Sequence, residues 1–132
     1  AHSLGAMHVL AGETRRCRGL VAINGFDRFM AAPDVPGVAT RVVERMIARF
    51  ADAPEAVLGE FRQRCGAGAE TVPLAADPLA EDLRLLRDGD CRPEAASLPA
   101  PILSLQGARD PILPAAMRAQ AFASAHRIDR DE

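Results

Sequence analysis

The chain has 132 residues, of which 48% are hydrophobic and 26% are charged, and this composition is typical of one modest globular domain with its own core. Its 16 basic and 18 acidic residues give a formal charge of -2, which does not favour nucleic acid as a partner. No stretch approaches the roughly 18 apolar residues of a membrane span, so no membrane attachment is expected, and three scattered cysteines without CxxC spacing indicate a reducing, cytoplasmic setting and no metal site.

The chain opens on a small-x-Ser-x-small pentapeptide, residues 1–5, which runs directly into a predicted helix over residues 6–12. This pattern is typical of a nucleophile elbow, in which a serine occupies a tight turn between a strand and a helix. The flanking residues must be small because strand and helix pass close beneath the turn, and the serine has to hold an unfavourable backbone conformation. Ser3 is therefore a candidate nucleophile, and the alternative is that it only caps the helix.

A short apolar run, residues 19–23, follows the predicted helix and ends at Asn24-Gly25. Such an uninterrupted run predicts a strand of a parallel sheet with both faces buried. The elbow, the helix and this strand would together make the second half of a βαβ unit.

Three amphipathic helices are predicted next, over residues 38–50, over residues 55–65 with Pro54 in the first turn, and from about Asp77 to Arg87. Three helices are more than a simple crossover needs, so we interpret them as a lid over the carboxyl-terminal edge of the sheet. The side chains predicted to be buried are Val42, Val43, Met46, Ile47, Phe50, Val57, Leu58, Phe61, Leu79, Leu83, Leu85 and Leu86.

The second strand is predicted at residues 101–105, paired in parallel with the first strand. It runs into a Gly-x-x-Asp-x-x-x-Pro segment that contains Asp110, and then into a helix over residues 115–124. One more strand could start at residues 127–129. The predicted fold class is therefore α/β, with parallel strands flanked by helices and a helical lid between them.

The serine elbow, the helical insertion and the late Gly-x-x-Asp-x-x-x-Pro segment resemble the α/β-hydrolase family, whose catalytic residues follow the order Ser, acid, His. The resemblance implies that Ser3 is the nucleophile, that Asp110 is the acid, and that the backbone N–H of Leu4 is one oxyanion donor. It also implies a partial hydrolase fold truncated at both ends, with the first strands before Ala1 and the histidine beyond residue 132. The chain alone is therefore expected to be inactive.

The resemblance divides the chain into a first core segment, a lid and a second core segment, namely residues 1–25, 26–97 and 98–132. Four other residues remain as alternatives for the triad. His126 precedes the last predicted strand and so lies at its wrong end, His8 is expected to point into packing, and His2 is expected to line the pocket. Asp27 is a rival acid, because some relatives take theirs from the end of the preceding strand.

Within the family, several segments are similar to the carboxylesterases of biotin synthesis that act on the pimeloyl-acyl-carrier-protein methyl ester, namely residues 23–26, 88–92, 98–101 and 107–114. This similarity implies a serine carboxylesterase that works through an acyl-enzyme, without a metal or an organic cofactor. His2, Phe26 and Phe29 would bind the substrate. The alternatives are a thioesterase or lactonase of the same fold, or a non-catalytic binding protein.

Three arginines, Arg41, Arg45 and Arg49, recur every four residues and so share one stripe of the first lid helix. Guanidinium groups bind carboxylates and phosphates in a fork geometry, so the stripe suits an acidic partner. The similarity to the biotin-pathway enzymes implies that this partner is the acyl carrier protein. The alternative is a solvated helix face, with Glu44 nearby.

Overall fold

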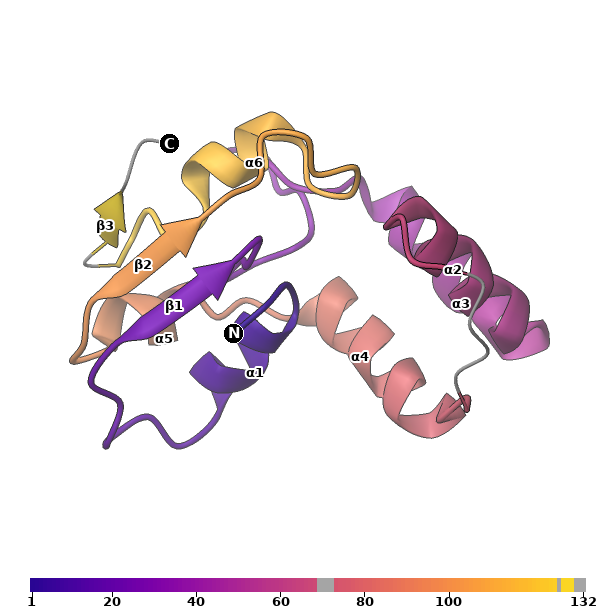
Figure 1. The fold of residues 1–132 in the computed structure, drawn as a ribbon, viewed down its shortest axis with the longest axis horizontal. Coiled ribbons are helices and arrows are strands. Elements are labelled where there is room, and N and C mark those ends of the chain that lie inside the picture. The colour runs from indigo at the N-terminus through magenta and orange to yellow at the C-terminus, as the bar shows by residue number, and fades with distance from the viewer. Residues whose placement is uncertain (69–72, 126, 130–132) are drawn as a thin grey trace.

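A computed structural model of the protein describes residues 1–68, 73–125 and 127–129. None of the helices in these ranges is long and apolar enough to cross a membrane. The chain combines parallel strands with helices, and α2 to α5 all lie between β1 and β2 (Figure 1). The elements in order are α1 (Gly5–Ala11), β1 (Leu20–Ile23), α2 (Thr40–Asp52), α3 (Pro54–Arg64), α4 (Ala76–Asp88), α5 (Arg92–Ser97), β2 (Ile102–Leu105), α6 (Ala115–Gln120) and β3 (Arg127–Asp129).

The sheet is parallel, with the strand order β1-β2-β3. The predicted pairing of the two apolar runs is confirmed, with Leu20 opposite Ile102 and Ile23 opposite Leu105. The start of the chain lies on the other edge of β1, where the N–H of Ile23 donates to the carbonyl of Ala1 at 2.9 Å. The carboxyl ends of β1 and β2 therefore share one edge of the sheet, and the chain reaches Ser3 at that edge.

Only one face of the sheet is well covered. Leu20 and Ala22 are buried, whereas their neighbours Val21 and Ile23 are 46% and 47% exposed. Alternate side chains of a strand point to opposite faces, and the described helices pack on the face of Leu20 and Ala22. The prediction that the first strand is buried on both faces was therefore wrong.

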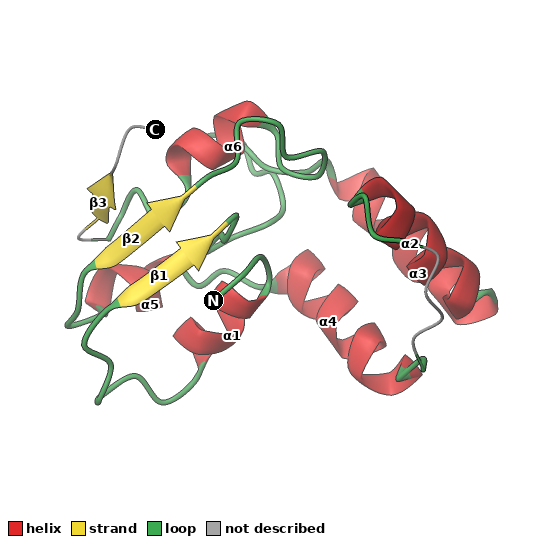
Figure 2. Cartoon of the chain, in the orientation of Figure 1, coloured by secondary structure: helices red, strands yellow, loops and turns green. Residues whose placement is uncertain are grey.

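Helices α2, α3 and α4, here called the insertion helices, form a layer beside the sheet (Figure 2). The three predicted helices are confirmed. They share a small apolar cluster of their own, in which Phe50, Val57 and Leu83 are the buried members. The predicted burial of Val42 and Phe61 was wrong, because these side chains are 40% and 39% exposed.

Two short helices differ from the sequence prediction. Helix α5 was not predicted, since it has only six residues and no apolar stripe. Helix α6 was predicted to reach residue 124 but ends at Gln120. It stops at the cap residue Ala121, whose ψ of 129° is extended, and the φ of 59° at the next residue, Phe122, also lies outside the right-handed helical region.

The chain enters and leaves the insertion helices through a narrow neck, which we define as Asp27, Arg28, Asp90 and Arg92. Arg28 and Asp90 form an antiparallel bridge, and their side chains pair at 2.8 Å. Arg92 holds the same carboxylate through two nitrogens, at 2.7 and 2.5 Å. These guanidinium groups hold the pKa of Asp90 well below its usual range, chiefly through the bonds from Arg92.

Candidate active site

The backbone at Ser3 has the geometry of a strained elbow. Ser3 has a φ of 51°, its N–H donates to the carbonyl of Ile23 at 3.0 Å, and α1 begins two residues later. A non-glycine residue in this region costs on the order of 1–3 kcal/mol and has to be held by its surroundings. The crowding expected at the residues that flank Ser3 was wrong for Gly5, where a Cβ would come no nearer than 4.0 Å, to the Cβ of Ala1. The close approach lies instead at Gly25, where a Cβ would lie 3.0 Å from the Cβ atoms of Ala22 and Ala6.

Ser3 is not the helix cap. Leu4 occupies the N-cap position, and no side chain caps α1. The alternative reading of Ser3 as a capping residue is therefore wrong. The backbone N–H of Leu4 has no hydrogen-bond partner among the described residues, whereas that of Gly5 donates to the carbonyl of His2. A free N–H directly after the serine, at the N-terminal end of a helix, is suited to an oxygen that gains negative charge.

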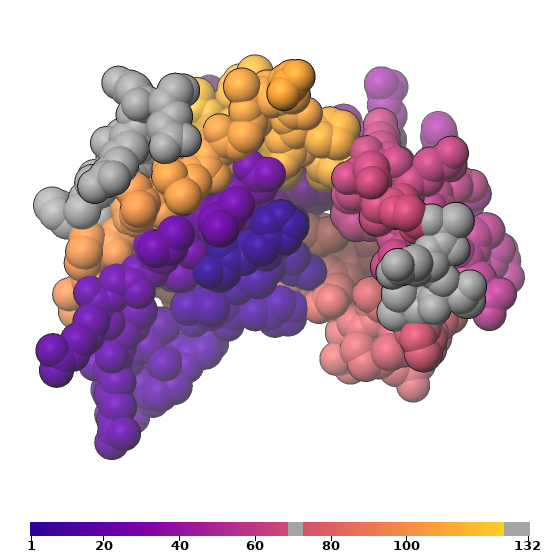
Figure 3. All heavy atoms as spheres, viewed as in Figure 1, coloured from indigo at the N-terminus to yellow at the C-terminus, as the bar shows by residue number. Residues whose placement is uncertain are grey.

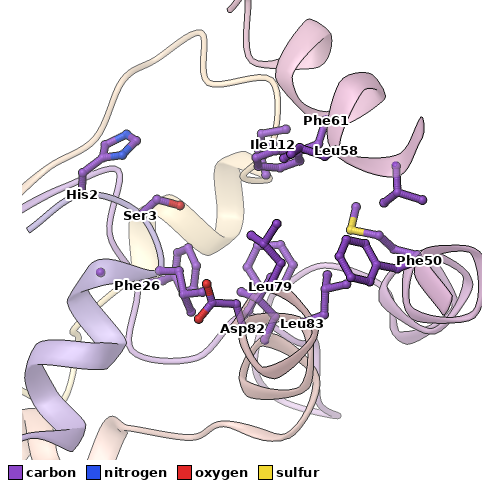
Figure 4. Close-up of a pocket in the computed structure, with 16 residues that line it drawn as sticks. His2, Ser3, Phe26, Phe50, Leu58, Phe61, Leu79, Asp82, Leu83 and Ile112 are labelled. Atoms are coloured by element: carbon purple, nitrogen blue, oxygen red, sulfur yellow. The ribbon is translucent and has the colours of Figure 1, made fainter. Parts of the chain in front are cut away.

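An apolar cavity of about 260 Å³ opens beside the elbow, between α1 and the insertion helices (Figure 3). Figure 4 shows the Ser3 hydroxyl pointing toward this cavity. Phe26 and Phe29 line it on the core side, with ring centroids 5.0 Å apart. The remaining lining residues are His2, Leu4, Gly5, Met46, Phe50, Val57, Leu58, Phe61, Leu79, Asp82, Leu83, Leu86 and Ile112.

Asp110 lies in the loop that follows β2. Its Oδ1 accepts hydrogen bonds from the backbone N–H groups of Ile112 and Leu113, at 2.7 and 2.9 Å. These two bonds fix the carboxylate in the loop. No partner of Oδ2 is found in the described part of the chain, so this oxygen remains available to another donor.

A continuous set of hydrogen bonds links the Ser3 turn to the Asp110 loop. Asn24 follows directly after Ile23, which holds Ser3, and the Asn24 side chain accepts from the N–H of Gly107 at 2.7 Å. The carbonyl of Gly107 in turn accepts from the N–H of Asp110 at 3.1 Å. Ser3 and Asp110 are thus brought to the same carboxyl-terminal edge of the sheet by β1 and β2. The sequence marks Asn24 only as a turn residue, so this link was missed.

The rival acid lies elsewhere. Asp27 is 5% exposed, and it lines a different cavity, together with Arg28 and Arg92. Burial raises the pKa of its carboxyl group, against the opposing effect of the backbone N–H of Phe122. Neither Asp27 nor Asp110 is among the residues that line the cavity beside Ser3.

The histidines have different surroundings. His2 is exposed and lines the Ser3 cavity, as expected. His8 was expected to point into packing, which was wrong, because it is exposed and its Nε2 lies 2.8 Å from Oδ1 of Asp82 on α4. Asp82 was missed, and no local pattern marks it, since its partner is 74 positions away. His126 lies outside the described residues.

The arginine stripe borders an outer groove between α2 and α3. Arg41, Arg45 and Arg49 line this groove together with the exposed Val42 and Phe61. Arg49 is not free, because both of its terminal nitrogens pair with Glu60 of α3, at 2.8 and 2.5 Å. Glu60 is thus an acidic neighbour of the stripe that the sequence did not mark.

No cluster of three or more potential metal ligands occurs within residues 1–68 and 73–125. A scan against models of known protein families finds no match for this chain, and no curated protein matches it.

Proposed function

We propose that the chain belongs to a serine carboxylesterase of the α/β-hydrolase fold, with the insertion helices as its lid. The observation that carries this proposal is the Ser3 elbow, in which a serine with a φ of 51° stands at an apolar cavity, beside a Leu4 N–H that has no partner among the described residues. A strained serine is retained where the surrounding backbone holds it, and such strain is concentrated at functional sites.

The proposed reaction uses Ser3 as nucleophile. A histidine has to take the hydroxyl proton, and Oδ2 of Asp110 would orient that histidine, because Oδ1 is already occupied by two backbone N–H groups. Attack of the Ser3 oxygen on the ester carbonyl forms a tetrahedral intermediate, whose oxyanion the Leu4 N–H would stabilise. The alcohol then leaves with the proton from the histidine, and water hydrolyses the acyl-enzyme.

The cavity supports an acyl substrate. At about 260 Å³ it lies near the lower end of small-molecule sites, which span about 300–1,000 Å³, and most of its walls are aliphatic or aromatic. We propose a methyl ester of an acyl group carried by the acyl carrier protein, in biotin synthesis. Restored growth without biotin, in a bacterium that lacks its own esterase for this step, would test the pathway.

The enzyme proposal is tested by ester hydrolysis with the full-length protein. A burst of p-nitrophenol from a short-chain ester is expected, and Ser3→Ala should abolish it while the melting temperature is retained. Loss of the catalytic unit lowers the rate on the order of 10⁶-fold. The 132-residue chain alone should show no turnover, because neither described histidine bridges Ser3 and Asp110. An unchanged rate in Ser3→Ala would refute the proposal and favour a binding protein.

The outer groove supports an acidic partner. Arg41 and Arg45 have no ion-pair partner in the described part of the chain, and two exposed apolar side chains lie beside them. The double variant Arg41→Ala/Arg45→Ala should slow hydrolysis of a carrier-bound ester and weaken its salt dependence, while a small free ester is cleaved as before. Arg84→Ala, on the exposed surface of α4, is the matched control. Equal losses on both esters would mean that the stripe only supports the fold.

A further inference from the structure

The apolar cavity contains one acidic side chain. Among its lining residues Asp82 is the only carboxylate, and no arginine lines it. The arginines of α2 border the outer groove instead. The cavity and the groove share Met46, Val57 and Phe61 in their linings but differ in the charged side chains that border them.

The position of Asp82 is fixed from outside the insertion helices. Its Oδ1 lies 2.8 Å from Nε2 of His8, which is on α1, directly after the Ser3 turn. The Asp82 side chain is 36% exposed, and no partner of its Oδ2 is found among the described residues. Figure 4 shows the carboxylate below Phe26, beside the route from Ser3 to the apolar side chains of the insertion helices.

We propose that Asp82 determines the charge selectivity of the cavity, so that it accepts acyl chains with an uncharged or cationic far end and excludes chains that end in a carboxylate. The inference rests on the proposed esterase function, because it takes the cavity as the acyl site. Asp82 lines the same cavity as Ser3, so a chain that extends from Ser3 between the insertion helices shares this cavity with its carboxylate. Two like charges a few Å apart in a partly desolvated site repel strongly. The lining contains no arginine to offset this repulsion, and the basic side chains near Asp82 and in the lining are the histidines His8 and His2.

The substrate class follows from this selectivity. It comprises esters of simple monocarboxylic acids, and of dicarboxylic acids whose second carboxyl is masked as an ester or thioester. A carrier-bound acyl methyl ester belongs to this class. A dicarboxylic acid monoester with a free second carboxylate does not.

The test measures binding and needs no turnover. Three methyl ketones of equal chain length, whose far ends are a methyl, a carboxylate or an ammonium group, are titrated into the protein by calorimetry. Ketones imitate the ester carbonyl but cannot be hydrolysed, so the result does not depend on catalysis. The wild type, Asp82→Asn and Glu81→Gln are compared. Glu81 is exposed, adjacent to Asp82 on α4 and absent from the cavity lining, so its variant removes the same charge elsewhere.

We expect Asp82→Asn to improve the affinity for the carboxylate ketone, relative to the methyl ketone, on the order of tenfold. The same variant should weaken the binding of the ammonium ketone by a similar factor. Glu81→Gln should keep the wild-type ratios of affinity among the three ketones. Unaltered ratios in Asp82→Asn would overturn the proposal, as would equal changes in both variants or no binding of any ketone. Selective binding without ester hydrolysis by the full-length protein would refute the esterase and leave the charge selectivity standing.

Discussion

The core and the insertion helices both bury apolar side chains, but to different depths. In the core, Ala22, Ile102 and Phe122 are completely buried, and the cluster extends over α1, both central strands, α5 and α6. In the insertion helices the buried members of the cluster, Phe50 and Leu83 among them, are 6–9% exposed. These same side chains line the cavity beside Ser3.

Apolar burial therefore has two roles in this molecule, one in positioning the backbone and one in contacting a ligand. The core positions the backbone that holds Ser3 and Asp110, and most of its side chains have no other role. The insertion helices stabilise themselves with the side chains that would contact a ligand. A substitution in the core away from the cavity-lining Phe26 and Phe29 should therefore change stability alone, whereas a substitution in the insertion helices should change stability and binding together.

The largest effect is expected at Ile102, in the centre of the sheet. Ile102→Ala removes a completely buried side chain, and the free energy of unfolding should fall by about 3–5 kcal/mol in urea titrations. Val21→Ala on the bare face of β1 is the control, and it should cost less than about 1 kcal/mol because Val21 is 46% exposed. Similar losses in both variants would mean that the bare face is covered in solution.

A smaller loss of stability is expected at Leu83, together with weaker binding. Leu83→Ala should lower the free energy of unfolding by about 2–3 kcal/mol, because the site is 9% exposed and borders an existing cavity. It should also lower the affinity for an apolar ketone ligand about tenfold, because contact area is lost. Unchanged affinity in the folded variant would contradict the double role of these side chains.

Neutralising Asp90 in the neck should lower the free energy of unfolding by about 1 kcal/mol. The pKa of Asp90 is lowered in the folded protein, so its ion pairs stabilise the fold above the unfolded pKa of about 3.9 and are lost as the pH falls. Asp90→Asn should therefore reduce stability at pH 7 and flatten its decline in acid. The value is modest because solvent screens the partly exposed Arg92.

Asp27→Asn is the matched variant in the neck. Its effect on stability at pH 7 should have the opposite sign to that of Asp90→Asn. Burial raises the pKa of Asp27, so its contribution to stability is complete below the unfolded pKa and decreases as the pH rises through the folded value. The variant should be at least as stable as the wild type at pH 7. Equal destabilisation by both variants would contradict the separate roles of the two carboxylates.

The smallest expected effect is a gain in stability from a substitution in the insertion helices. No atom lies within 4 Å of a Cβ placed on Gly59, in the middle of α3. Gly59→Ala should raise the free energy of unfolding by about 0.5–1 kcal/mol through helix propensity, and ketone binding should not change. A loss of affinity would show that α3 has to flex when a ligand binds.

Local patterns were sufficient for most of the fold. Two apolar runs predicted the parallel strands, and proline and glycine positions separated the insertion helices. The Ser3 turn was also predicted from its local pattern, although the close approach expected at Gly5 occurs at Gly25. The sequence does not show what covers an apolar stripe, so the exposure of Val42, Phe61 and one face of β1 was missed.

Long-range contacts account for the other errors. Helix α5 is too short to form by propensity, and it packs on α1, where the Cys91 thiol lies 3.8 Å from the carbonyl of Met7. The contact between His8 and Asp82 joins positions 74 apart, and only the folded chain brings them together. The cavity depends on the same placement of α4 against α1.

The neck makes the insertion helices an exchangeable module. The chain leaves the core at Arg28 and returns at Asp90, and these two residues pair directly. A segment whose ends already meet can be shortened, replaced or recombined without changing the distance that the core has to span. Chimeras that keep the neck and exchange residues 31–87 should therefore retain the Ser3 turn and the Asp110 loop while acquiring the cavity of the donor.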